Sequence, residues 1–234
     1  MKLAIMQPYI FPYIGYFQLI NAVDEFVLYN DVQFIKGGWI NRNNLLINDK
    51  KTMFVFSLQG ASTFSNINER KFDKSKFEFE KMKFLKTLSI SYVKAPFFNE
   101  IFGFLKSTLE LTNLNVSQSI NITLIETCSK LNLKTKIINS EDINYNRELS
   151  AEEKVIDICK STGASIYINS IGGMDLYNKI TFAQNNINLN FIKTGNIKYQ
   201  QFNNNFIPNL SIIDVLMFNG FNGTSELLKQ FEIL

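Results

Sequence analysis

The chain has 234 residues, and 24 Lys and Arg residues against 21 Asp and Glu residues give it a formal net charge of +3. This near balance, with only three arginines, provides no strong positive field for gripping nucleic acid, so we expect no DNA partner. The chain has no histidine, which excludes a histidine general base, a histidine-based catalytic triad and histidine metal ligands.

The remaining composition predicts one globular domain. Hydrophobic residues make up 46% of the chain, and no linker or repeat divides it, so we expect a single domain over residues 1–234. Two cysteines without motif spacing exclude a cysteine-rich zinc site, so we predict no metal site. The chain has neither an apolar run of ~18–20 residues nor a signal-peptide pattern, which predicts a cytoplasmic protein without a membrane span.

The first third of the chain predicts a strand, a loop, a helix and a second strand, which is a Rossmann-like start. The strands are expected at 2–6 and 25–29, the first loop at 7–12 and the helix near 13–21. A polar loop is expected at 37–44 and a third strand at 52–57, followed by an irregular stretch at 58–74.

The rest of the chain alternates helical and strand patterns. Helices are expected near 75–93, 98–111 and 117–131, and strands at 133–139, 165–169 and 187–192. Ser150 followed by Glu153 is a capping-box signal for a helix that stops at Gly163, and two helices are expected near 211–218 and 224–231. Cys128 and Cys159 lie on apolar helix faces and are expected to be structural. The pattern favours an α/β fold with a mostly parallel sheet flanked by helices.

The loop after the first strand has features of a ligand site. The strand delivers Gln7, two prolines fix the loop, and Gly15 allows close backbone approach where the helix starts. A helix start presents free N–H groups, which commonly bind phosphate. Tyr13 and Tyr16 are candidate binding residues there, although these aromatics could equally be core and rim residues.

A second candidate site follows the second strand. Asp31 comes directly after the strand, so its carboxylate is expected at the sheet's end. Five further candidates crowd the next loop, namely Lys36, Trp39, Asn41, Arg42 and Asn43. A tryptophan beside amides suits a sugar ring stacked on indole, and an arginine can clamp a diphosphate or carboxylate. The alternative is a structural loop in which Arg42 pairs with Asp31.

Two later segments add candidates. Asn169 ends a predicted strand, and Gly172 and Gly173 follow it before Tyr177, a pattern that suits either a ligand or a tight turn. Gln200 is a candidate polar contact. Asp214 lies on an otherwise apolar helix, so its carboxylate must be paired or functional, and an Asp that ties the helix to a loop is the favoured interpretation.

Five segments together resemble the WbqC-like family, in order along the whole chain. They are MQPYIFPYIGYFQLI, NDVQFIKGGWINRN, SYVKAPFF, YINSIGGMDLY and YQQF followed by FIPNLSIIDVLMFNG. The first segment also resembles the start of nucleotidyltransferases with an HxGH motif, with Tyr13 and Tyr16 in place of the histidines. That second likeness implies binding of a nucleotide phosphate rather than nucleotidyl transfer.

The family resemblance implies a role in O-antigen or capsular polysaccharide biosynthesis, with acyl or aminoacyl transfer to an amino sugar. The expected partner is a dTDP- or UDP-linked amino deoxysugar. No intrinsic cofactor is expected, and the acyl donor could be acyl-CoA, aminoacyl-tRNA or a carrier-bound amino acid. The alternative is a non-catalytic protein that binds a glycan precursor or a partner of the same pathway.

The expected chemistry needs few groups. Asp31 is the first candidate for the base, and Lys36 or Asn41 would stabilise the oxyanion. Because open α/β sheets bind ligands beyond the carboxyl ends of their strands, five features should line one pocket. These are Gln7, Asp31, Arg42, Asn169 and the Gly172-Gly173 turn.

Overall fold

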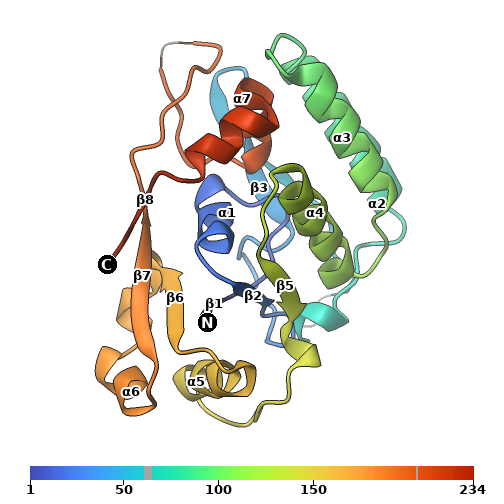
Figure 1. Ribbon diagram of the computed structural model, residues 1–234. Helices are drawn as coiled ribbons and strands as arrows, with labels where there is room; N and C mark the ends of the chain where they lie inside the picture. Colours follow the sequence, from blue (N-terminus) through green and yellow to red (C-terminus); the bar gives the residue numbers. More distant parts are fainter. Residues whose placement is uncertain (61–64, 204) are drawn as a thin grey trace.

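A six-stranded sheet with the strand order β5-β2-β1-β6-β7-β8 forms the centre of the molecule (Figure 1). The structure is a computed structural model that describes residues 1–60, 65–203 and 205–234. The strands are β1 (Lys2–Met6), β2 (Glu25–Leu28), β5 (Lys136–Asn139), β6 (Ile166–Ser170), β7 (Asn188–Thr194) and β8 (Phe231–Ile233). Neighbours from β5 to β7 pair in parallel, whereas β8 runs antiparallel to β7. The predicted α/β fold with a mostly parallel sheet is therefore confirmed.

Residue alternation gives this sheet two apolar faces. In β1, Ala4 packs in one buried cluster, whereas Leu3 and Ile5 pack in a second. Phe26 and Val27 of β2 divide between the same two clusters. Successive side chains of a strand point to opposite faces, so strands this apolar need helices on both sides.

Helices cover both faces (Figure 1). One face carries α1 (Ile14–Asn21), α4 (Val116–Lys130) and α7 (Ile212–Leu227), with α2 (Phe77–Ser91) and α3 (Phe98–Glu110) packed outside them. The other carries α5 (Ala151–Thr162) and α6 (Lys179–Gln184). Short 3-10 helices occur at Ile67–Glu69, Ser140–Asp142 and Ile171–Leu176. None of the helices in the described ranges combines the length and the apolar character that crossing a bilayer requires.

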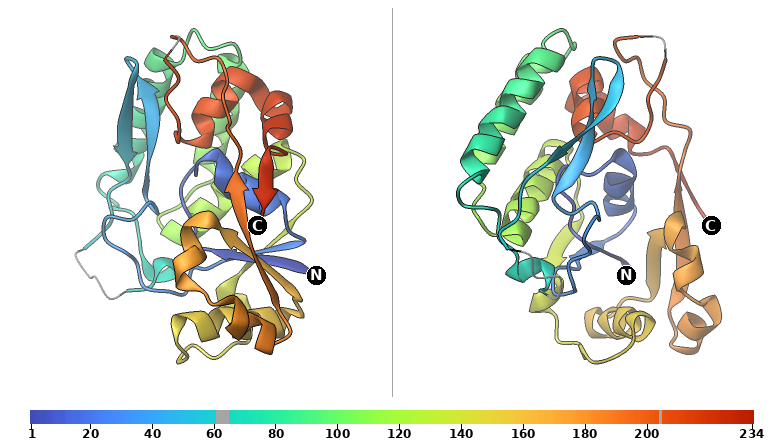
Figure 2. Two further views of the ribbon diagram at one scale, coloured as in Figure 1. Left: turned by 90° about the vertical axis from the view of Figure 1, so that its left-hand side faces the viewer. Right: turned by 180° about the vertical axis from the view of Figure 1, so that it is seen from behind.

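A hairpin of β3 (Arg42–Ile47) and β4 (Lys50–Val55) stands apart from the main sheet, beside α2 (Figure 2). The predicted loop at 37–44 is wrong at its end, because the strand already begins at Arg42. Asn43 and Asn44 favour a loop by composition, yet both are buried in this strand. The turn between the strands uses Asn48 and Asp49 with positive φ, which these residue types tolerate.

The C-terminal region has the two helical segments predicted, but with different bounds. Helix α7 continues to Leu227 through a kink at Gly220, and the chain then forms β8. Gly220 has φ 63° and ψ −174°, a conformation essentially confined to glycine. The side chain of Phe97 occupies the space that a Cβ would fill there. The break between the two predicted helices therefore lies at Gly220, and the second helix ends at Leu227 rather than near 231, where β8 begins.

The predicted capping box of α5, its end at Gly163 and the structural role of the two cysteines are confirmed. Ser150 and Glu153 form a capping box, and Gly163 ends the helix with φ 73°. Cys128 and Cys159 are buried free thiols, and burial raises the pKa of each to about 12. Neither thiol is suited to act as a nucleophile at neutral pH.

Candidate functional site

The site region lies where the strand order reverses. From β1 the chain moves to β2 and β5 on one side and then to β6 and β7 on the other. Gln7 follows β1, and Asn169 lies at the end of β6, so both belong to the carboxyl edge at this reversal. Open α/β sheets commonly bind ligands at this place.

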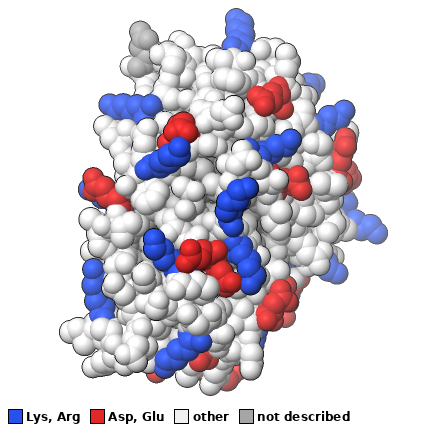
Figure 3. Space-filling model, in the orientation of Figure 1, with Lys and Arg blue, Asp and Glu red and all other residues white. Residues whose placement is uncertain are grey.

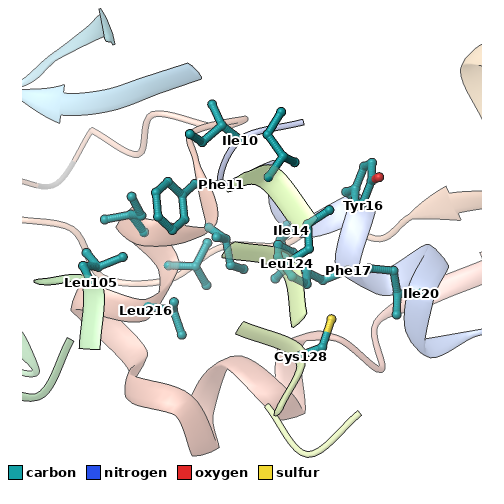
Figure 4. Packing of buried hydrophobic residues seen from close by; sticks show 14 of the residues in the cluster. Ile10, Phe11, Ile14, Tyr16, Phe17, Ile20, Leu105, Leu124, Cys128 and Leu216 are labelled. Atoms are coloured by element: carbon teal, nitrogen blue, oxygen red, sulfur yellow. The ribbon is translucent and has the colours of Figure 1, made fainter. Parts of the chain in front are cut away.

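The loop between β1 and α1 is held in a strained shape from two directions. Phe11 is buried and has φ 42°, which is unusual for a bulky side chain. Its carbonyl accepts hydrogen bonds from Asn43 Nδ2 at 2.8 Å and from Ser211 Oγ at 2.7 Å. Figure 4 shows Ile10 and Phe11 in the core above Leu216. The hairpin and the start of α7 together fix this loop.

Helices α1 and α7 begin beside each other. Tyr13, the N-cap of α1, forms a β-bridge with Ser211, the N-cap of α7, and Ile212 N–H donates to Pro12 O at 2.8 Å. The Tyr13 side chain makes no capping hydrogen bond to α1. At Gly15, a Cβ would lie 2.3 Å from the Tyr13 ring and 2.6 Å from Thr194 Oγ1. A side chain at this position would displace the Tyr13 ring and the Thr194 side chain, so glycine allows both to lie against the helix start.

Two adjoining cavities flank these helix starts. The β7 cavity, of about 660 Å³, is lined by the end of β7 and the segment after it, including Ile14, Lys198, Tyr199 and Asn209. The Trp39 cavity, of about 400 Å³, shares Asn209 with it. Its lining consists of Tyr9, Pro12, Tyr13, Trp39, Asn43, Asn44, Lys51 and Asn209. The described linings of both cavities contain aromatic, amide and lysine side chains and no carboxylate.

The Trp39 cavity offers an aromatic surface and hydrogen-bond donors. Trp39 is 43% exposed, so its ring is available for stacking. Burial raises the pKa of Tyr9 and of Tyr13, so both phenols stay protonated and can donate. Tyr16 lies deeper, where its hydroxyl donates to Gln7 O at 3.0 Å.

Asp214 is buried behind the β7 cavity and is fully paired. It accepts hydrogen bonds from Tyr92 at 2.8 Å, Tyr199 at 2.6 Å and Gln201 Nε2 at 2.8 Å. Burial raises the pKa of Asp214 above its usual value, although these hydrogen bonds oppose the shift. Gln200 lies beside this network and donates to Gln201 O at 2.9 Å. The contacts agree with the predicted carboxylate that ties a helix to a loop.

Asp31 is also held by several donors. It accepts hydrogen bonds from Ser140 Oγ and, at 2.8 Å, from the Tyr145 hydroxyl. Its other oxygen forms an ion pair with Arg147 Nε at 2.8 Å. The guanidinium of Arg147 lies 4.4 Å from the centre of the Tyr145 ring. The partner of Asp31 is therefore Arg147, which the sequence interpretation missed, rather than Arg42.

Lys36, Asn41 and Arg42 line a third cavity of about 400 Å³, whose wall includes residues on both sides of Trp39 in the sequence. Asn41 Nδ2 donates to Phe56 O at 2.7 Å, and Arg42 Nε donates to Gly38 O at 2.7 Å. The guanidinium of Arg42 lies 5.7 Å from the Trp39 ring centre. This cationic cavity and the Trp39 cavity thus share one loop as their wall.

The glycine pair after β6 lies inside a 3-10 helix, Ile171–Leu176. Asn169 Oδ1 accepts a hydrogen bond from Ser170 N–H at 2.8 Å, and a Cβ on Gly173 would lie 2.5 Å from Asn169 Nδ2. Gly172 has open space around it. Tyr177 packs edge-on against Phe182 on the α5 and α6 face.

The structure thus divides the predicted site residues into groups. Tyr13, Trp39 and Asn43 line one cavity, and Lys36, Asn41 and Arg42 line another. The three cavities include neither Gln7, Asp31 nor Asn169, so convergence of these residues in one pocket stays a prediction.

Five residues of the Trp39 cavity are not among the sequence candidates, namely Tyr9, Pro12, Asn44, Lys51 and Asn209. Lys51 lies just outside a predicted strand, and Asn44 lies at the end of the predicted polar loop. Asn209 follows a proline and has φ 57°. The Pro-Asn pair before the helix cap was the available signal for this turn.

Comparisons with known proteins give one family. The model of the WbqC-like protein family matches residues 7–226. An uncharacterized protein of Mycobacterium tuberculosis, Rv1507c, is 30% identical over 221 residues, which cover 93% of each chain. No solved structure shows significant similarity.

Proposed function

Because the chain belongs to the WbqC-like protein family, we propose that it is a sugar N-acyltransferase of O-antigen or capsule biosynthesis. It would act in the cytoplasm and transfer an acyl or aminoacyl group to a nucleotide-linked amino deoxysugar. The nucleotide would be dTDP or UDP.

The observation that carries this proposal is the pair of adjoining cavities at the starts of α1 and α7. Their volumes, about 660 Å³ and 400 Å³, lie within the range of small-molecule sites. The Trp39 ring and the surrounding amides suit a sugar, whose ring stacks on indole and whose hydroxyls bind amides. Lys51 and Lys198, which line these cavities, and the positive end of the α1 dipole suit a diphosphate.

The proposed reaction is attack of the sugar amine on the donor's acyl carbonyl carbon. The C–N bond forms, the bond to the donor's sulfur or oxygen breaks, and the leaving group departs with its electron pair. The amine must lose a proton, and we assign its acceptance to Asp31, with Asn41 or Lys36 donating to the oxyanion. Gln7, Asn169 and the Gly172-Gly173 turn would position substrate at the same edge of the sheet.

A non-catalytic binding protein of the same pathway is the second candidate. One observation favours it: the Asp31 carboxylate already accepts from Ser140, Tyr145 and Arg147. The oxygens of this carboxylate are thus already engaged by groups of the chain itself, rather than free to contact a substrate amine. Such a protein would still bind the sugar nucleotide in the Trp39 cavity.

The test is incubation with dTDP- and UDP-linked 3-amino and 4-amino sugars, followed by mass spectrometry. Acyl-CoA, aminoacyl-tRNA and a carrier-bound amino acid serve as donors in separate arms. We expect a mass gain of one acyl group on the sugar with one donor class. Absence of product in every arm, with sugar-nucleotide binding retained, would establish the binding protein instead.

Trp39→Ala tests the cavity itself. Loss of the stacking surface should weaken sugar-nucleotide binding about tenfold, measured by calorimetry. The matched control is Phe79→Ala on α2, where the aromatic side chain is 64% exposed and lines neither adjoining cavity. Equal affinity of the Trp39 variant and the wild type would contradict the proposed sugar site.

A further inference from the structure

The cationic cavity brings together four basic side chains from distant parts of the chain. Lys36 and Arg42 come from the loop that carries Trp39 and the start of β3, Arg70 follows the first 3-10 helix, and Lys76 precedes α2. Two of the chain's three arginines therefore line one cavity of about 400 Å³. The described lining contains no carboxylate.

The charges in this cavity are only partly compensated. Across the described residues, no ion pair involves Lys36 or Arg42. Lys76 has a neighbouring carboxylate in Asp73, at 3.4 Å. Arg70 is buried, with its guanidinium 5.2 Å from the Phe34 ring centre, which fixes its position.

Glu80 of α2 contacts the wall of this cavity through Ser57 rather than through a lysine or arginine of the lining. Glu80 accepts from Ser57 N–H at 2.7 Å and from Ser57 Oγ at 2.6 Å. Ser57 itself lines the cavity, so this carboxylate also anchors part of the wall. Lys36 and Arg42 are thus left available for an anion from outside the chain.

The wall also allows an anion to approach the backbone. Gly37 and Gly60 line the cavity with φ 85° and φ 68°, and a Cβ on Gly60 would meet nothing within 4 Å. Bare backbone beside guanidinium and ammonium groups is a common environment for phosphate.

We infer that the cationic cavity binds the phosphate groups of a small acyl donor of the coenzyme A class. The inference rests on the proposed function and assigns the donor side of the reaction. Coenzyme A carries a diphosphate and a 3′-phosphate, whose charges match Lys36 and Arg42, which form no ion pair within the described residues. Lys36 then belongs to the phosphate site, and Asn41 is the oxyanion donor of the two named above. The shared loop would then separate donor phosphates from the sugar in the Trp39 cavity, with Arg42 and Trp39 in contact across it.

The charge distribution favours a small donor over a nucleic acid. The chain's net charge is only +3. On the face that Figure 3 displays, Lys and Arg side chains alternate with Asp and Glu. A tRNA needs an extended basic surface for its phosphates, whereas this cavity holds a few phosphate groups.

The test is calorimetric titration of the full chain with coenzyme A and, in a second arm, inorganic pyrophosphate. The variant is Lys36→Gln with Arg42→Gln, and the control is Lys106→Gln, an exposed lysine of α3. We expect the double variant to weaken coenzyme A binding about a hundredfold, since each charge-assisted contact contributes about tenfold. The control should bind like the wild type, and thermal unfolding of all proteins confirms that they fold.

Each outcome decides the inference. Unchanged coenzyme A affinity in the double variant, or no binding by the wild type, overturns it. Binding of pyrophosphate without coenzyme A leaves an anion site but removes the donor assignment. A third arm with UDP-linked amino sugar separates the two proposals. If the wild type binds this sugar nucleotide but not coenzyme A, only the donor site is ruled out. If it binds neither compound, the proposed function is ruled out as well.

Discussion

The carboxylates of Asp214 and Asp31 both accept hydrogen bonds from tyrosine hydroxyl groups. Asp214 accepts from Tyr92 and Tyr199, and Asp31 accepts from Tyr145. Such donors fix the carboxylates in place and tie together elements far apart in the chain. Substitution at each aspartate therefore tests whether its carboxylate stabilises the fold or takes part in the reaction.

Asp214→Asn should lower the free energy of unfolding by about 1–3 kcal/mol, because an amide cannot accept from all three donors. The pKa of Asp214 is raised by burial, so the folded state holds this proton more tightly than the unfolded state. The resulting stabilisation is complete below the unfolded pKa of about 3.9 and is lost as pH rises through the folded pKa.

Urea unfolding of both proteins from acid to neutral pH measures this effect. The difference between the two free energies isolates residue 214 because the other groups are common to both proteins. The wild type should lose stability relative to the variant as pH rises above about 4. If the difference in free energy of unfolding stays constant over this pH range, burial does not raise the pKa of Asp214.

Asp31→Asn tests the proton acceptor. If Asp31 removes the amine proton, turnover should fall more than a hundredfold while sugar-nucleotide affinity stays near wild type. The matched control is Arg147→Gln, which removes the same ion pair from its other side. Arg147 is 44% exposed but the Asp31 side chain is only 7% exposed, so loss of the pair leaves a largely buried carboxylate and should cost about 1–3 kcal/mol of stability. Equal loss of turnover in both variants would indicate that the pair only positions the site.

Among the elements, α7 carries the clearest conformational constraint. Gly220 combines positive φ with the Phe97 ring, whose Cδ1 would lie 2.7 Å from an added Cβ. Gly220→Ala should destabilise the fold by about 2–4 kcal/mol through backbone strain and displacement of that ring.

Gly103→Ala in α3 is the matched control for Gly220→Ala. Gly103 lies inside a helix with nothing within 4 Å of an added Cβ, so alanine there should stabilise by about 0.5–1 kcal/mol. Thermal unfolding of both variants checks the opposite signs. A tolerated alanine at Gly220 would mean that the kink straightens freely.

Elements that depend on local sequence signals could be predicted, whereas features that depend on contacts between distant residues could not. Apolar runs and the Ser150 cap are local signals, so the main strands and α5 were predictable. Strand β3 was not predicted, because Asn43 and Asn44 resemble loop residues until Asn43 is seen to donate to Phe11 O. The Asp31–Arg147 pair joins residues 116 positions apart, and a single sequence has no local signal for such pairing.

At the scale of the whole molecule, Ser211 links the start and the end of the chain. Its Oγ accepts from Ile213 N–H at 3.3 Å as a helix cap and donates to Phe11 O at 2.7 Å. Ser211→Ala should therefore cost about 1–3 kcal/mol of stability and also weaken sugar-nucleotide binding, because the loop beside the Trp39 cavity loses one support.

The control for Ser211→Ala is Ser150→Ala, which removes the cap of α5 on the other face of the sheet. It should cost about 1 kcal/mol and leave binding unchanged. Chemical denaturation and calorimetric titration of both variants give the two readouts. Equal effects on binding would show that Ser211 acts only as a cap.

The support of Phe11 by Ser211 also sets an order of events during synthesis. The two residues lie 200 positions apart, so the loop that contains Phe11 leaves the ribosome well before Ser211 does. Its strained shape lacks this support until the start of α7 emerges. The loop is thus made long before it can mature, and a nascent chain that stops before Ser211 would have strands β1 to β7 without a competent site.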